Sequence, residues 1–246
     1  MAKKNRARTD TVTDCACVIH GTGYDWIYVE KLYNMLTHHL QHGIRFHVYT
    51  EAARPVPPHM IKHELTEWPG ISGPKRSWWY KMQLFNPEHH TGDLFYIDLD
   101  TVIVDDLGWI FNHSTQYFWT IRDFRYLQHS TISTMNSSVM WFNVDAMSWM
   151  YHKFSQEHLP TIMRTYHGDQ DYIEAVVPHQ QRRFLDIAKF ASFRWQAYRG
   201  GMNWQTRQPR DPQANTTIPP GTSVLVFHGH PKPHEVNCAL VKQLWQ

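Results

Sequence analysis

Short apolar runs alternate with longer amphipathic stretches along the chain. CACVIH (15–20) and IRFHVYTE (44–51) are β-rich and almost free of charge, which is typical of buried strands. The segment between them, residues 26–43, repeats apolar side chains at helical spacing and ends on Gly43, a residue that commonly stops a helix. A strand, a helix and a strand at this spacing predict a βαβ unit and therefore a parallel sheet.

The same alternation continues to the end of the chain. Further strands are predicted at 63–68, 94–104, 117–124, 137–146, 182–188 and 223–229. Further helices are predicted at 77–85, 147–159 and 168–177. The fold class is therefore α/β, a mixed and mostly parallel sheet flanked by helices on both faces. We find no internal repeat and no clean linker, so residues 14–246 are expected to form a single domain.

Composition narrows the function classes. The 246 residues are 42% hydrophobic and carry a formal net charge of only +2, so no field for a polyanion follows and a nucleic-acid partner is disfavoured. Aromatic residues reach 14%, which suits a large core and also flat platforms for sugars and bases. Three cysteines without a CxxC pair argue against a disulfide framework and a zinc knuckle, and we expect Cys15 and Cys17 to be buried in a strand.

Two segments stand apart from this pattern. Residues 1–13 are basic and lack an apolar core, so we expect a disordered tail and no secretory signal peptide. No stretch approaches 18 apolar residues, so no transmembrane segment is expected and a cytoplasmic location is predicted. Residues 200–221 are polar and rich in Gly, Pro and Asn, which predicts a long loop that acts as a lid.

Candidate chemistry is concentrated first in LFYIDLDTVIV (94–104). In an extended strand, Asp98 and Asp100 face the same side, and ligands of open α/β sheets bind outside the carboxyl ends of the strands. Two carboxylates on one face suit a hard divalent cation such as Mg²⁺ or Mn²⁺. The alternative is an ordinary turn with two solvated carboxylates.

Three other stretches carry polar groups next to apolar runs. VLVFHGHPKPHE (224–235) places His228 at the end of a strand and Lys232 after it, and these residue types suit a metal and a phosphate. GDQDYI (168–173) and MNSSVMWFN (135–143) put carboxylates, an amide and hydroxyls beside a helix start and a strand. Each stretch alone also fits a surface turn or a helix cap.

In chain order, these pieces resemble a glycosyltransferase of the GT-A type. The resemblance is nearest to the retaining branch that includes glycogenin and the bacterial lipopolysaccharide galactosyltransferases, and it covers residues 15–235. It is carried by CVIHGTGYD, WWYKMQLF, LFYIDLDTVI, MNSSVMWFN, GDQDYI and FHGHPKP.

The resemblance implies two abutting Rossmann-like halves, a nucleotide-diphosphate sugar as donor, UDP-sugar first among them, and Mn²⁺ or Mg²⁺ as cofactor. It implies that the metal is held by Asp98, Asp100 and His228. It implies that the donor is bound by His20, Gly21, Tyr24, Lys81, Asp98, Asn136, Ser137 and Lys232. It implies that the reactive face of the sugar is lined by Asp169, Gln170 and Asp171.

Two departures from the family pattern matter. The close spacing of His228 and Lys232 leaves open whether His228 or His230 is the ligand. Lys81 stands where relatives often have Arg, which removes bidentate geometry.

Several readings of the function stay open at this stage. Within the resemblance, transfer with retention can proceed through a transient nucleophile or by front-face attack, and the acceptor is an unidentified glycan, lipid, protein or modified base. A sugar nucleotidyltransferase is a second reading, although the chain lacks a Gly-rich phosphate loop after its first strand. A non-catalytic carbohydrate-binding or assembly protein is the third.

Overall fold

The computed structural model describes residues 12–71, 76–129, 134–154, 159–203, 205–206, 208–211 and 216–246. Its main element is a seven-stranded sheet. The strand order is β3 (Ile61–Glu64), β2 (Gly43–Thr50), β1 (Val12–Val18), β4 (Asp93–Ile97), β7 (Met135–Asn143), β6 (Phe118–Arg122) and β8 (Arg182–Phe184). The first four run parallel, β7 is antiparallel to both of its neighbours, and β8 is parallel to β6. The mixed, mostly parallel α/β sheet predicted from the sequence is thus confirmed.

A smaller sheet lies beside the first and contains segments far apart in the sequence. Its order is β5 (Thr101–Ile103), β12 (Val224–Val226) and β9 (Phe190–Ser192). A further two-stranded pair joins β10 (Met202–Asn203) to β11 (Gln208–Pro209). That pair lies in the segment 200–221 predicted as a lid. Residues 204, 207 and 212–215 of that segment lie outside the described residues, and the lid stays a prediction.

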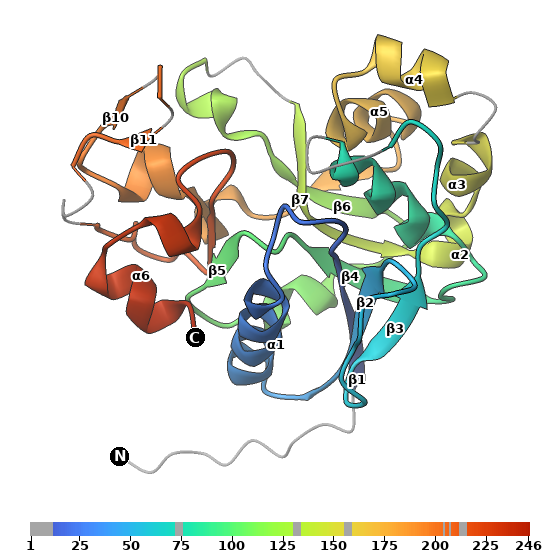
Figure 1. Cartoon of the computed structure of the whole chain (residues 1–246), viewed down its shortest axis with the longest axis horizontal. Helices are drawn as coiled ribbons and strands as arrows, with labels where there is room; N and C mark the ends of the chain where they lie inside the picture. Colours follow the sequence, from blue (N-terminus) through green and yellow to red (C-terminus); the bar gives the residue numbers. More distant parts are fainter. Residues whose placement is uncertain are drawn as a thin grey trace.

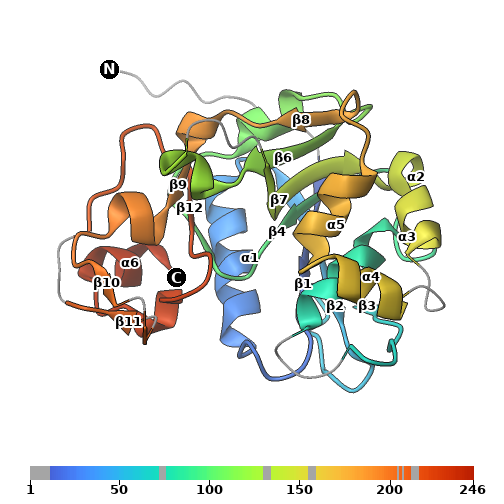
Figure 2. The same ribbon diagram turned by 90° about the horizontal axis from the view of Figure 1, so that it is seen from above.

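The helices and the small sheet cover the two faces of the large sheet (Figures 1 and 2). On one side are the small sheet with α1 (Ile27–His39) and α6 (Ala239–Leu244). On the other are η1 (Ser77–Phe85), α2 (Val144–Met147), α3 (Trp149–Lys153), α4 (Leu159–Thr165) and α5 (Asp169–Val176). The side chains of β1 point alternately to the two faces of the sheet. Cys15 and Cys17 pack in the core on the α1 side, and Ala16 packs in the core on the opposite side. Both cysteines are fully buried and free, as expected.

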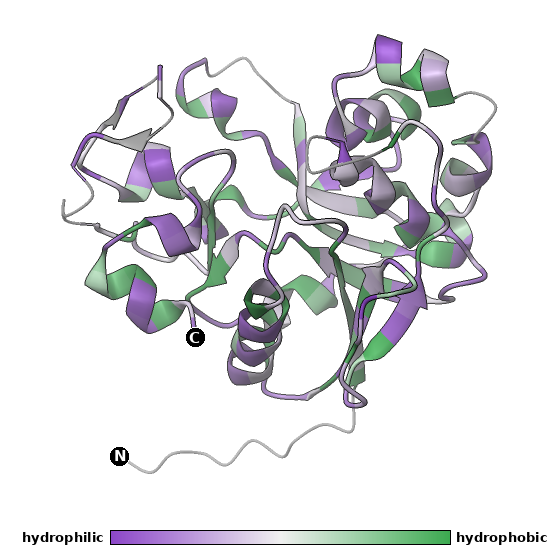
Figure 3. Cartoon of the chain, in the orientation of Figure 1, coloured by the Kyte–Doolittle hydropathy of each residue, from purple (hydrophilic) through white to green (hydrophobic). Residues whose placement is uncertain are grey.

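Aromatic packing fills the core under η1. Phe85, Phe118 and Phe142 are fully buried, and the ring of Phe142 lies 4.8 Å from that of Phe85 and 5.6 Å from that of Phe118. Burial of such a ring stabilises a fold by roughly 1.5–3 kcal/mol. Figure 3 shows the opposite character at β3, which is mostly hydrophilic. Polar side chains at that edge oppose pairing with another chain.

Several predicted boundaries were wrong. The first helix ends at His39, because Leu40 is already extended, and Gly43 opens β2 instead of stopping the helix. The strand predicted at 137–146 ends at Asn143, because α2 already begins at Val144. Within the helix predicted at 147–159, α3 covers only Trp149–Lys153, and residues 155–158 lie outside the described residues. The first strand, predicted at 15–20, spans Val12–Val18. Residues 1–11 of the expected tail lie outside the described part.

No described helix combines the length and the apolar character needed to cross a membrane.

Candidate active site

The predicted strand 94–104 is in fact two strands joined by a turn. Strand β4 ends at Ile97 in the large sheet, and β5 begins at Thr101 in the small one. Asp98 and Asp100 therefore lie in the turn between them and do not share one face of a strand, which corrects the prediction made from the i, i+2 spacing. The turn is fastened on both sides, since Asp98 N donates to Ser138 O at 2.8 Å and Phe227 N donates to Asp100 O at 3.0 Å.

Asp98 belongs to a buried ionic group on the α5 side of the large sheet. The Lys81 ammonium, from η1, lies 2.8 Å from Asp98 Oδ1 and 3.4 Å from Asp169 Oδ2. Ser137 on β7 donates its hydroxyl to Asp169 at 2.7 Å, and Tyr96 donates to Asp98 at 2.5 Å. One ammonium and two hydroxyls thus satisfy two carboxylates in a region where an unpaired charge is costly.

The charges in this group shift one another's pKa values. Burial opposes the ammonium of Lys81, but Asp169 and Asp98 outweigh it and raise the pKa of Lys81. Burial acts to raise the pKa of Asp98, but the Lys81 ammonium and hydrogen bonds lower it overall. Burial dominates for Asp169 and raises its pKa, against Lys81 and the Ser137 hydroxyl. Asp98 is therefore held ionised next to Asp169, a carboxyl group that binds its proton more tightly.

Asp100 faces the other side of the turn, toward the small sheet. Its Oδ2 accepts a hydrogen bond from Tyr24 Oη at 2.8 Å and also pairs with the ammonium of Lys232. The same ammonium lies 5.3 Å from the centre of the Tyr24 ring. Burial, together with Asp100 and Asp98, raises the pKa of Tyr24 far above its usual value. The structure thus places Tyr24 as a donor to Asp100, whereas stacking against a base was the predicted role.

The two candidate histidines have different surroundings. His228 Nε2 lies 2.7 Å from Ser192 Oγ, and its ring stacks on Phe124 at 5.2 Å. Burial lowers the pKa of His228 to about 3, so its imidazole is neutral and keeps a lone pair for a cation. His230 is more exposed and pairs with Glu235 at 2.9 Å. His228 is thus neutral and enclosed, whereas His230 is more exposed and paired with Glu235, and the assignment of His228 as a metal ligand stays a prediction.

Two predicted site residues in the loop after β1, His20 and Gly21, interact with partners of their own. His20 pairs with Glu67 at 3.0 Å, and the carbonyl of Gly21 accepts a hydrogen bond from Arg54 at 2.6 Å. The positive φ of Gly21, 67°, is the backbone geometry that favours glycine in this loop.

The predicted site residues on β7 and at the start of α5 also differ in their surroundings. Asn136 is buried on β7, and its side chain accepts from Ser138 N at 2.9 Å. Gln170 donates to Asp123 at 2.9 Å. Asp171 is exposed and forms no hydrogen bond or ion pair within the described part of the chain. Asp169 and Gln170 are therefore held by neighbouring side chains, whereas the side chain of Asp171 is exposed to solvent.

Sequence reasoning missed Tyr96 and Asp123. Tyr96 lies two residues before Asp98, and Asp123 directly follows strand β6 (Phe118–Arg122). The rule that drew attention to Asp98, polar groups at the ends of strands, would also have found Asp123. A tyrosine within an apolar strand gave no such signal, because its ring fits a core equally well.

A pocket of about 370 Å³ flanks the buried ionic group. It is lined by Arg76, Trp78, Trp79, Met163, Arg164, Thr165, Tyr166 and His167. The pocket wall adjoins the buried ionic group, since Trp78 packs against Gly168, the residue before Asp169. The indole N–H of Trp78 is buried without a hydrogen-bond partner among the described residues.

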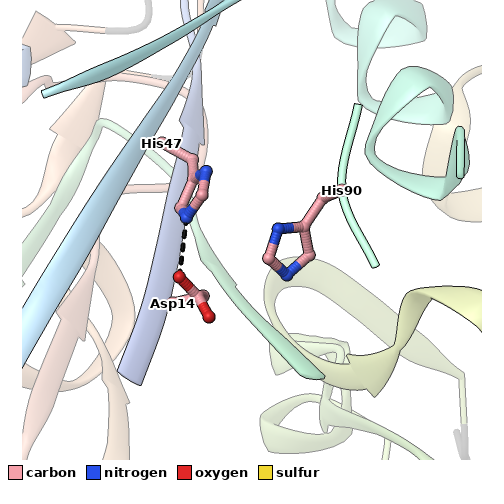
Figure 4. Close-up of side chains that lie close together, drawn as sticks. All are labelled: Asp14, His47 and His90. Carbon is pink, nitrogen blue, oxygen red and sulfur yellow. Dashed lines mark hydrogen bonds and ion pairs between the residues drawn. The ribbon is translucent and has the colours of Figure 1, made fainter. Parts of the chain in front are cut away.

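A group that could hold a metal lies elsewhere. Asp14, His47 and His90 offer ligand atoms that all lie within 4.8 Å of one another (Figure 4). Among the described residues, Asp98, Asp100 and His228 do not form a group of that kind. In this structure, lysine ammonium groups lie against the two carboxylates of the turn.

Comparison with solved structures returned glycosyltransferases. An active-site mutant of LgtC matches 94% of this chain and 95% of its own, with a TM-score of 0.64 and 14% identity. GlyE from Streptococcus pneumoniae TIGR4 gives a TM-score of 0.63 and 13% identity over 95% of this chain, which spans about 60% of GlyE. Mouse xyloside xylosyltransferase 1 gives 0.53 and 12% identity over 89% of this chain and 98% of its own.

No family model matches the sequence. No curated protein matches it either. The structural matches and the mixed sheet together show that the chain has the GT-A glycosyltransferase fold, resembling LgtC-type galactosyltransferases.

Proposed function

We propose that the protein is a metal-dependent glycosyltransferase that moves a sugar from a nucleotide-diphosphate sugar, UDP-sugar first among the candidates, to an acceptor with retention. The observation that carries this proposal is the turn at 98–100. There, two carboxylates lie between the large and the small sheet, each held by a lysine. Carboxylates and ammonium groups at the carboxyl ends of strands suit a cation and a diphosphate.

The donor set fits a divalent cation. By residue type, Asp98 and Asp100 would supply hard oxygen ligands and His228 a neutral nitrogen, a combination that suits Mn²⁺ or Mg²⁺. To bind one ion, the two carboxylates would have to turn toward each other and away from Lys81 and Lys232, which lie against them in this structure. Such a cation would supply charge neutralisation for the departing nucleoside diphosphate. The lysine that pairs with Asp100 would then be free to meet the same diphosphate, because Lys232 reaches this carboxylate from the loop after β12.

The protein's own residues would act on the sugar side. Asp169 and Gln170, at the start of α5, are proposed to face the donor sugar and to stabilise positive charge at its anomeric carbon. Lys81 and Ser137 hold the Asp169 carboxyl in place, at 3.4 and 2.7 Å. The fixed orientation of a carboxyl and an amide supports a role in positioning the donor sugar for transfer.

The acceptor is proposed to enter through the pocket that Trp78 borders. An aromatic wall formed by Trp78 and His167, whose rings stack at 6.2 Å, matches the apolar face of a sugar ring. Because the pocket adjoins the backbone of Gly168, an acceptor bound there would lie next to Asp169. Trp78→Ala should then raise KM for the acceptor and leave binding of the donor unchanged.

The test of the proposed function is a donor screen by thermal shift, followed by product analysis. UDP-, GDP-, ADP- and CMP-sugars are added with and without Mn²⁺ to the wild-type protein, to Asp100→Asn and to Asp106→Asn. Asp106 is an exposed carboxylate whose hydrogen bond to Gly108 N an asparagine can keep, which makes it the matched control.

A donor-specific rise in Tm that needs Mn²⁺ and disappears only in Asp100→Asn is the expected result. Release of a nucleoside diphosphate from the sugar nucleotide then identifies a transferase, whereas release of diphosphate from a nucleoside triphosphate and a sugar phosphate identifies a nucleotidyltransferase. Binding of sugars without metal and without turnover would replace the proposal by a carbohydrate-binding protein.

A further inference from the structure

A second polar cluster lies on the large sheet, at the end opposite to the turn at 98–100. Asp14 is near the start of β1, His47 is on the neighbouring strand β2, and His90 is in the loop that leads from η1 to β4 (Figure 4). Asp14 lies at least four residues from the carboxyl end of β1 (Val12–Val18), about 13 Å at the rise of an extended strand. The cluster is therefore separate from the candidate active site.

The donor atoms of this cluster converge. His47 Nε2 lies 2.8 Å from Asp14 Oδ1, and the rings of His47 and His90 are 4.8 Å apart at a steep angle. Each side chain offers one ligand atom, and the three atoms lie within 4.8 Å of one another, so small side-chain rotations would bring them around one cation. Figure 4 shows that the ring of His90 faces the same space as Asp14 and His47.

A supporting hydrogen bond orients the central ligand. His47 Nδ1 lies 2.8 Å from Nε2 of His63 on β3. When His47 Nδ1 carries the proton and donates it to His63, the lone pair of His47 Nε2 points at Asp14 and needs a cation between the two. When His63 donates instead, His47 Nε2–H donates to Asp14. The hydrogen-bond network therefore has one arrangement with a metal bound and another without it. A bound metal selects the arrangement in which His47 Nδ1 carries the proton.

The pairing of Asp14 with Arg45 does not close the site. Arg45 contacts both carboxylate oxygens, at 2.6 and 2.5 Å. Its side chain is 57% exposed, so this is a surface ion pair of small net worth, from which the guanidinium can turn outward. The side chain of Asp14 is only 11% exposed, which holds the carboxylate beside His47 whether or not Arg45 remains.

From this geometry we infer that Asp14, His47 and His90 form a zinc site. Two imidazole nitrogens and one carboxylate oxygen are the ligand types of Zn²⁺ in four-coordinate sites, with the last position left for water. Magnesium and calcium prefer oxygen ligands and are disfavoured here. The ion would tie the loop before β4 to β1 and β2, through ligands that are 33 to 76 residues apart in the sequence, and would therefore stabilise the fold.

The experiment is a titration of the metal-free protein with ZnCl₂, followed by Tm and by calorimetry. Wild type is compared with His90→Ala, with Asp100→Asn and with His129→Ala, in which an exposed histidine outside the cluster is removed. With Zn²⁺ at about 100 times its Kd, a rise in Tm of about 5–10 °C is expected for a chain of this length. The rise should persist in Asp100→Asn and His129→Ala, should be lost in His90→Ala, and should reverse with a chelator.

A second readout keeps the inference falsifiable if a variant folds poorly. In ¹⁵N-labelled wild-type protein, ZnCl₂ should convert His47 to the tautomer with its proton on Nδ1, which imidazole nitrogen shifts report directly. Retention of the full Tm rise in His90→Ala would overturn the inference. So would loss of the rise in Asp100→Asn alone, since the ion would then occupy the turn at 98–100, or an unchanged His47 tautomer at saturating Zn²⁺.

Discussion

Replacement of Lys81 by methionine tests how the buried ionic group is balanced. Methionine keeps an unbranched apolar stem of similar length beside the Tyr96 ring, over which the ammonium lies at 5.4 Å, but it removes the charge. Asp98 and Asp169 then remain enclosed, at 18% and 7% side-chain exposure, with hydroxyl groups as donors. The perturbation is electrostatic and leaves the volume of the core nearly unchanged.

The magnitude follows from the loss of one partner of a buried pair, which costs about 3–5 kcal/mol. For a chain of 246 residues this lowers Tm by roughly 6–20 °C, at about 2–4 °C per kcal/mol. The double variant Lys81→Met with Asp169→Asn should recover part of the loss, because it leaves one buried carboxylate in place of two. That recovery separates the charge from any effect of shape.

The pH dependence has a defined sign. Without the ammonium, the folded-state pKa values of Asp98 and Asp169 rise above those of the unfolded chain, so the variant binds protons on folding. Stability of that kind is present below the unfolded pKa and is lost as the pH rises through the folded pKa. The deficit of the variant should therefore grow from pH 5 to pH 8, by up to about 1.4 kcal/mol per pH unit for each carboxyl still protonated in the folded state.

Urea unfolding of wild type and variants at both pH values measures this directly. A deficit that is equal at pH 5 and pH 8, or smaller than about 1 kcal/mol at pH 8, would refute the reasoning, because the carboxylates would then be satisfied without Lys81.

Three further predictions concern separate parts of the chain. Asp100→Asn should reduce glycosyl transfer about 10²–10³-fold, measured as nucleoside diphosphate release, and should also lower stability in urea, because the Lys232 ammonium loses its charged partner. Gly200→Ala should overlap the hydroxyl of Tyr198 and the carbonyl of Asp211, so limited trypsin digestion should cut this segment faster than in wild type; an unchanged rate would contradict the contact. Phe142→Ala should destabilise by about 3–5 kcal/mol in urea, and a loss below 1 kcal/mol would mean that the aromatic cluster collapses around the gap.

Sequence periodicity was enough to predict the α/β class and most strands, because alternation and apolar runs reflect burial that the structure retains. It also directed attention to Asp98 and Asp100. It failed at the turn between them, since LFYIDLDTVIV is apolar throughout and a change of sheet leaves no trace in hydropathy. The cluster around His47 was missed for a related reason: its ligands come from three segments, and no spacing in the sequence links them.

The two carboxylates of the turn at 98–100 are held by different parts of the fold. Asp98 is held through Ser138 and Lys81, which belong to the large-sheet side, and Asp100 through Phe227 and Lys232, which belong to the small-sheet side. Three residues therefore connect the two sheets, and a ligand that engages both carboxylates would link the large sheet to the small one. Hydrogen exchange should register such a ligand in the amides of β5 and β12 before any change is seen in the middle of the large sheet.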